Sequence, residues 1–178
     1  AMGIINSVAQ LLVMSIIAIN MASQPIIGFN FGAKQYARVR DTLITCIWAA
    51  TSIAIGGFLL TQLFPGAIVR IFNNDNPELF ELGRKGLRIF TLFFPIVGFQ
   101  IITGNYYQSI GKAGIAAFLS LLRQVIILIP MLYILPPFTQ LEGVWFANPI
   151  SDLLAGIISA LFLVKALKKL KGGTEKFN

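Results

Sequence analysis

Two stretches of this chain are too long and too apolar for a soluble domain. Residues 1–33 and residues 42–69 contain no Asp, Glu, Lys or Arg. About 20 apolar residues in a helix cross the hydrocarbon core of a bilayer, and a helix satisfies its own backbone hydrogen bonds there. Charged residues make up 12% of the chain, against about 25% in soluble domains. The sequence therefore predicts an all-α membrane protein.

We expect a bundle of about five transmembrane helices in one membrane domain, residues 1–171, followed by a cytoplasmic tail, residues 172–178. The spans are predicted near residues 3–28, 42–64, 87–109, 114–136 and 143–165. Residues 136–143 are expected to separate the last two helices. Asn76 is a candidate N-cap and Pro77 a candidate first helical residue. A surface helix is therefore expected to begin there and to continue into the third span.

The chain opens directly in a hydrophobic stretch. No basic region precedes this stretch, so we predict no cleavable signal peptide. A start of this kind is also what we expect of a piece cut from a longer membrane protein.

The basic residues predict the orientation in the membrane. Nine lie on the side of the C-terminal tail and four on the opposite side: Lys34, Arg38, Arg40, Lys112, Lys165, Lys168, Lys169, Lys171 and Lys176 against Arg70, Arg84, Lys85 and Arg88. Cytoplasmic segments carry the excess of Lys and Arg. We therefore expect a multi-pass protein of the plasma membrane with a cytoplasmic C-terminus. The same clustering at span ends argues against a nucleic-acid partner.

Two predicted spans each contain one ionisable residue, Arg123 in the fourth and Asp152 in the fifth. A charge at membrane depth is costly unless it is paired or hydrated. At 1.5 Å per residue, Arg123 lies about 13 Å from one membrane face and Asp152 about 14 Å from the other. In a core of about 30 Å the two side chains are expected to reach each other. The pair either locks two helices together or supplies a carboxylate for ion or proton coupling.

Polar side chains mark two further regions of the predicted spans. Asn20 and Gln24 share one arc of the first span, just before Pro25, where a kink is expected. They are candidates either for a substrate or cation pathway or for hydrogen bonds between helices.

The third span carries a polar stripe. Gln100, Thr103 and Tyr107 recur at helical spacing, and Pro95 and Gly98 suggest a bend. This stripe predicts either the lining of a wet cavity or a polar seam between helices. Together with Asp152, its residues complete the set of candidate pathway residues.

Enzyme chemistry has no sequence signature here. The chain has no His and a single Cys, Cys46, and nucleotide-binding, hydrolase and zinc-protease motifs do not occur. We predict a protein that is not an enzyme and has no metal site or cofactor.

Three segments resemble a known family. They are QPIIGFNFGAKQYARVR, then FPIVGFQIITGNYYQSIGKAGIAAFLSLLRQVIILIPMLYILP, and then GVWFANPISDLLA. Together they resemble the C-terminal lobe of multidrug and toxic compound extrusion (MATE) transporters, and the five spans look like helices eight to twelve of that family.

This resemblance implies one part of a two-lobe, twelve-helix antiporter in the lipid bilayer. Such a transporter exports cationic or amphipathic compounds in exchange for Na⁺ or H⁺. The N-terminal lobe would be its partner. The resemblance assigns no cation-binding acid to this chain.

Two alternatives stay open at this point. One is a lipid or polysaccharide flippase of the same superfamily, whose cavity should be rich in cationic residues. The other is a membrane remnant or dimerising module that does not transport.

Overall fold

The computed structural model describes residues 2–72 and 77–172. All regular elements in these ranges are helical, so the predicted all-α fold is confirmed. In chain order they are α1 (Met2–Gly32), α2 (Tyr36–Leu63), α3 (Pro65–Phe72), α4 (Pro77–Phe90), α5 (Phe94–Ser109), α6 (Ala113–Leu121), the π-helix η1 (Leu122–Ile127), α7 (Leu128–Ile134) and α8 (Pro136–Lys171).

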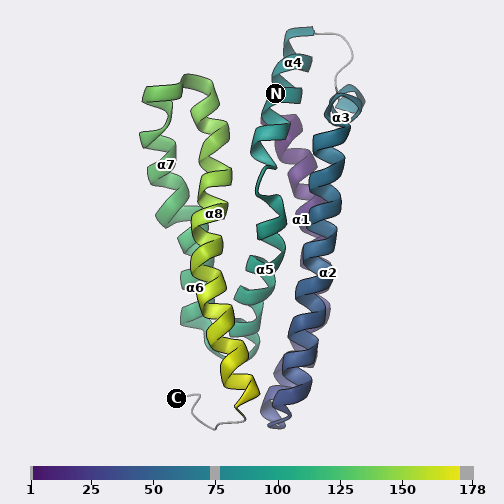
Figure 1. The fold of residues 1–178 in the computed structure, drawn as a ribbon, viewed down its shortest axis with the longest axis vertical. Helices are drawn as coiled ribbons and strands as arrows, with labels where there is room; N and C mark the ends of the chain where they lie inside the picture. Colours follow the sequence, from purple (N-terminus) through teal and green to yellow (C-terminus); the bar gives the residue numbers. More distant parts are fainter. Residues whose placement is uncertain (1, 73–76, 173–178) are drawn as a thin grey trace.

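The helix α5 is the centre of the bundle. It packs against α1 and α2 on one side and against α6 and α8 on the other, as Figure 1 shows. Its residues Val97, Ile102 and Tyr106 are fully buried, together with Leu43 of α2. The polar positions of α5 are therefore held between two groups of helices.

A glycine permits the closest approach of α5 to α2. A Cβ atom built on Gly98 would lie 2.8 Å from the backbone oxygen of Ala50, which is closer than real Cβ atoms come. Small residues at such positions let membrane helices approach backbone to backbone. Gly98 was expected to mark a bend, but it lies within the continuous helix α5.

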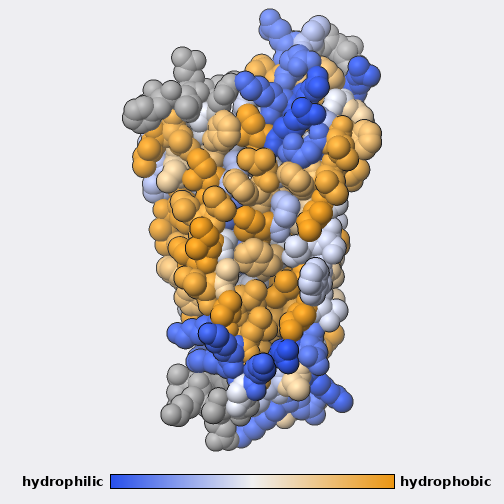
Figure 2. All heavy atoms as spheres, in the orientation of Figure 1, coloured by the Kyte–Doolittle hydropathy of each residue, from blue (hydrophilic) through white to orange (hydrophobic). Residues whose placement is uncertain are grey.

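Within the described residues, four helical segments are long and apolar enough to cross a membrane, and the bent pair α4–α5 makes up to five. Figure 2 shows a broad apolar band with polar residues gathered at the two ends of the molecule. The long axis of the bundle is thus expected to run across the bilayer.

The third predicted span is broken, where we expected one helix over residues 87–109. The helix α4 begins at Pro77 as predicted, but it ends at Phe90, and α5 continues after a bend of 50°. Pro95 follows at the first turn of α5. A proline ring clashes with the carbonyl four residues before it, here that of Thr91, so the break falls just before the bend expected at Pro95.

The other boundaries also differ from the expected ones in places. The helix α1 continues through Pro25, and α8 starts at Pro136, so residues 136–142 belong to a helix and do not form a separating loop. Proline is favoured at a first helical position, because the backbone N–H that it lacks has no partner there. The candidate cap Asn76 and residues 173–178 of the tail lie outside the described residues.

Candidate functional site

The two ionisable residues of the predicted spans are in contact. Arg123 on η1 donates through Nε to Oδ1 of Asp152 on α8, with the two atoms 2.6 Å apart. The Asp152 side chain is 6% exposed and that of Arg123 28%. A charge-assisted hydrogen bond of this length offsets part of the cost of removing both groups from water.

Arg123 lies in a π-helical segment that the sequence analysis did not predict. The backbone N–H of Leu128 donates to the carbonyl of Arg123, five residues earlier. This spacing widens the helix by one residue per turn, and π segments of this kind often occur at functional sites. The side chain that reaches Asp152 is therefore presented from an irregular turn.

A polar cavity of about 430 Å³ lies beside the pair, between α1, α5, α6, η1 and α8. Three residues selected from the sequence line it, namely Asn20, Gln100 and Arg123. Among the lining residues that the structure describes, Arg123 alone carries a charge. The cavity is therefore walled mostly by amides, hydroxyls and small apolar side chains.

Two amide oxygens of the cavity wall are left without a donor. Gln100 is 7% exposed and donates through Nε2 to the backbone oxygen of Asp152 at 2.7 Å. Its Oε1 atom, and Oδ1 of Asn20, have no hydrogen-bond partner among the described residues. Buried acceptors are almost always satisfied in folded proteins. A roomy cavity with such acceptors suits water molecules or a ligand that donates hydrogen bonds.

Several further cavity residues were not among the candidates chosen from the sequence. Asn105 on α5 donates through Nδ2 to the backbone oxygen of Asn20 at 3.1 Å and to Oγ of Ser23 at 3.2 Å. The others are Gln108, Ser120, Gln124 and Ser159. On α5, Gln108 follows Gln100 after about two helical turns, and this spacing carried a signal for the cavity face.

Two candidates from the polar stripe do not line the cavity. Thr103 is fully buried and donates to the carbonyl of Phe99 in its own helix at 2.7 Å. The Tyr107 hydroxyl donates to the backbone oxygen of Phe162 at 2.8 Å, and its ring meets the Phe162 ring edge to face. These contacts stabilise the helices and their packing.

Gln24 is half-buried and is not among the cavity-lining residues. The hydrogen bonds of α5 to its neighbours have a common form. Gln100, Asn105 and Tyr107 each donate from a side chain to a main-chain carbonyl of α1 or α8. Bonds between helices at membrane depth contribute about 0.6 kcal/mol each on average. Together they fix the rotation of α5 relative to both neighbouring groups of helices.

The fold and the cavity define a multi-pass α-helical membrane protein with a polar interior. The sequence profile of the MatE family matches residues 1–134. The chain therefore belongs to the MATE family, which comprises transporters and not enzymes, and the resemblance seen in the sequence is confirmed.

Solved structures agree with this assignment. The MATE multidrug transporter DinF-BH, solved in complex with rhodamine 6G, is 40% identical with a TM-score of 0.85, over 92% of this chain and 36% of that one. No match was found among the curated proteins.

Two more distant structures share the fold. A MATE in complex with MaL6 is 20% identical with a TM-score of 0.87, over 96% of this chain and 39% of that one. An inward-facing multidrug resistance MATE transporter of the MOP superfamily is 19% identical with a TM-score of 0.84, over 94% and 39%. The chain thus spans a little over a third of the length of these structures.

Proposed function

We propose that this chain forms most of one lobe of a secondary antiporter that exports cationic or amphipathic compounds in exchange for Na⁺ or H⁺. The observation that carries the proposal is the polar cavity with its two unpaired amide oxygens, Asn20 Oδ1 and Gln100 Oε1. Amide acceptors in an almost uncharged wall suit a solute that donates hydrogen bonds. The likeness to DinF-BH over 92% of the chain supports the substrate class.

The Arg123–Asp152 pair would serve this function in one of two ways. It fastens η1 to α8 beside the cavity, and Asp152 is the candidate carboxylate for coupling to the ion gradient. Replacement of Asp152 with Asn separates the two roles, because Asn keeps the shape of the side chain and removes its charge. A cytoplasmic C-terminus and a partner lobe that completes the transport path belong to the same proposal.

A flippase is favoured less by the cavity. Carriers of anionic lipids or sugars need several cations at the binding site, whereas Arg123 is the one charged lining residue in the described part of the chain, and it is already paired. A drug exporter is therefore the better match to this wall.

Transport in proteoliposomes tests the proposal. The chain is reconstituted alone and together with the part of DinF-BH that lies outside the matched region, and efflux of rhodamine 6G is followed after a proton or a sodium gradient is imposed. We expect gradient-driven efflux when both parts are present. Asp152→Asn is expected to reduce it strongly, while Asp41→Asn, the same change at an exposed site on α2, leaves it unchanged. The absence of gradient-driven efflux from the reconstituted pair would reject the proposed function.

A further inference from the structure

A hairpin of two helices caps the end of the bundle that is remote from the C-terminus. Figure 1 shows α3 almost end-on above α2, beside α4, so α3 lies across the bundle. A Cβ atom built on Gly83 of α4 would lie 3.2 Å from Cγ1 of Val69 on α3. This close approach ties the two helices together. Polar residues gather over the same end in Figure 2.

Three arginines surround a hollow of about 360 Å³ in this cap. Arg70 comes from α3, and Arg84 and Arg88 come from α4. The rest of the wall includes Leu63 and Phe64 at the end of α2. Residues four apart lie on one face of a helix, so Arg84 and Arg88 reach the hollow from the same side of α4.

Neighbouring groups hold two of the guanidinium groups in place. The Cζ atom of Arg70 lies 5.5 Å from the centroid of the Phe80 ring, and such stacking leaves the N–H edge of a guanidinium available for an acceptor. Arg88 donates through Nη2 to the backbone oxygen of Gln62 at 3.1 Å, and Gln62 donates back to the Arg88 carbonyl at 2.8 Å. The arginines thus converge on the hollow from two directions.

The charge of the hollow is strongly positive in the part of the chain that the structure describes. Glu81 approaches Arg84 at 3.8 Å, and both side chains are well exposed, at 68% and 44%. An exposed ion pair of this length is worth little. A cationic compound is repelled by this site, and an anion with several acceptor oxygens is favoured.

We propose that this hollow binds the phosphate headgroup of an anionic phospholipid. Arginine recognises phosphate through two parallel hydrogen bonds, and three arginines from two helices match the oxygens of one phosphate group. Leu63 and Phe64, which are 66% and 58% exposed, offer an apolar surface to the acyl chains. Amphipathic helices with basic and apolar faces lie at the level of lipid headgroups. The site is independent of the transport cavity.

Native mass spectrometry of the full chain in a non-ionic detergent tests this proposal. Phosphatidylglycerol and phosphatidylcholine are titrated separately, and the singly lipid-bound fraction gives an apparent Kd. We expect phosphatidylglycerol to bind more tightly. Arg84→Gln and Arg70→Gln should each weaken its binding by about tenfold or more, because each removes a charge-assisted hydrogen bond.

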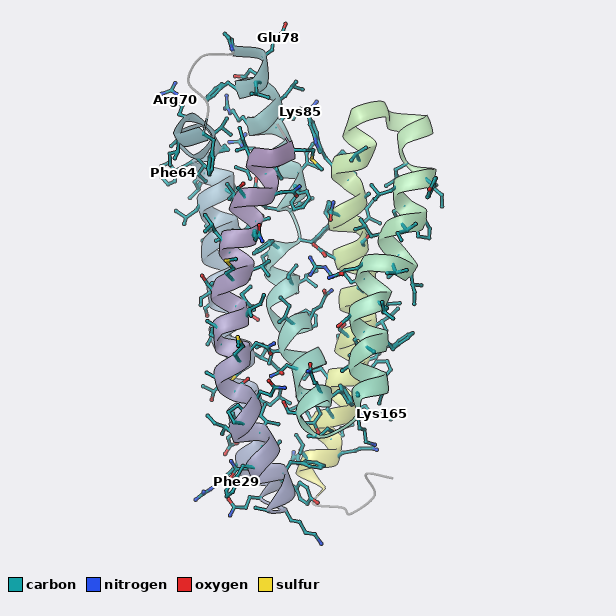
Figure 3. All side chains as sticks on the ribbon, turned by 180° about the vertical axis from the view of Figure 1, so that it is seen from behind. Phe29, Phe64, Arg70, Glu78, Lys85 and Lys165 are labelled. Carbon is teal, nitrogen blue, oxygen red and sulfur yellow. The ribbon has the colours of Figure 1, made fainter. Side chains whose placement is uncertain are left out.

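Lys85→Gln is the matched control, since it removes the same charge one residue along α4. Figure 3 shows Lys85 on the opposite side of α4 from Arg70 and Phe64, and Lys85 does not line the hollow. Its binding of phosphatidylglycerol should equal that of the unmodified chain. An equal loss for Lys85→Gln and Arg84→Gln would reduce the effect to overall surface charge and overturn the site.

Two further outcomes would also overturn it. Equal affinity for phosphatidylglycerol and phosphatidylcholine would exclude an anionic lipid as the occupant. Displacement of phosphatidylglycerol by inorganic phosphate at equal concentration would show a site for the free anion. Circular dichroism of each variant establishes that the helical fold is retained before binding is compared.

Discussion

Arg123 Nε and Asp152 Oδ1 lie 2.6 Å apart and join η1 to α8 across 29 positions of sequence. Gln100 completes this junction from α5, because its Nε2 atom donates to the backbone oxygen of the same Asp152 residue. One residue of α8 is therefore bound by two other helices at the depth of the cavity.

Removal of both partners of the Arg123–Asp152 pair should cost less than the sum of the two single removals. Arg123→Gln or Asp152→Asn leaves one group without its partner, and we expect each to lower the free energy of unfolding by about 2–3 kcal/mol. The double variant should recover at least about 1 kcal/mol of the summed loss. Unfolding in mixed detergent micelles measures all three.

The exposed Arg84–Glu81 pair, at 3.8 Å, is the internal control for that cycle. Its coupling energy should be near zero, because exposed pairs contribute little. Strictly additive losses for Arg123 and Asp152 would contradict a stabilising ion pair between them.

Gln100 and Thr103 should differ in their effect on transport, although they lie three residues apart on α5. Gln100→Leu removes a cavity amide and its bond to α8, and we expect about a fivefold drop in drug efflux. Thr103→Val removes a hydroxyl that bonds within its own helix, so efflux should hardly change. Efflux rates at matched protein levels decide this; a larger loss for Thr103→Val would argue against the cavity as the pathway.

Two glycines of α5 should respond in opposite directions to the same substitution. Gly98→Ala forces a methyl group onto the Ala50 backbone, and we expect a loss of about 1–3 kcal/mol in stability. A Cβ atom built on Gly104 meets no atom within 4 Å, so Gly104→Ala should gain up to about 1 kcal/mol from helix propensity. Thermal unfolding in detergent compares the two, and equal effects would disprove the close contact of α5 with α2.

The orientation in the membrane can be read by cysteine labelling. In a Cys46→Ser background, Gln35→Cys and Glu78→Cys place a thiol on either end of the bundle. The excess of Lys and Arg predicts that Gln35→Cys faces the cytoplasm. A membrane-impermeant thiol reagent applied to intact cells should then label Glu78→Cys alone. Labelling of Gln35→Cys without Glu78→Cys would invert the topology.

Hydropathy and helix geometry were sufficient to predict the helical bundle and to bring Arg123 and Asp152 to one level. Both inferences use quantities that hardly vary between proteins, namely the thickness of the bilayer and the rise per residue. The π segment gave no such signal, because a hydrogen bond to the fifth preceding residue leaves no periodic pattern in so short a stretch. The break at Thr91–Phe93 depended on where the clash caused by Pro95 is relieved.

Side-chain roles on α5 were harder to predict, because they depend on the neighbouring helix. Thr103 and Tyr107 have the same helical spacing as a cavity face, yet one bonds to its own helix and the other to α8. Asn105 is held at the cavity wall because α1 supplies the carbonyl of Asn20 beside it. Spacing along one helix cannot specify the acceptor on another.

The main-chain acceptors of α1 and α8 have a consequence for how this lobe can diverge. A carbonyl oxygen is present whatever side chain its residue carries, so substitution at the recipient position leaves the bond to α5 in place. Gln100, Asn105 and Tyr107, which supply the donors, have no such freedom. Among relatives, variation should therefore be one-sided, with α5 retaining its polar residues while the positions that receive their hydrogen bonds drift without compensating changes.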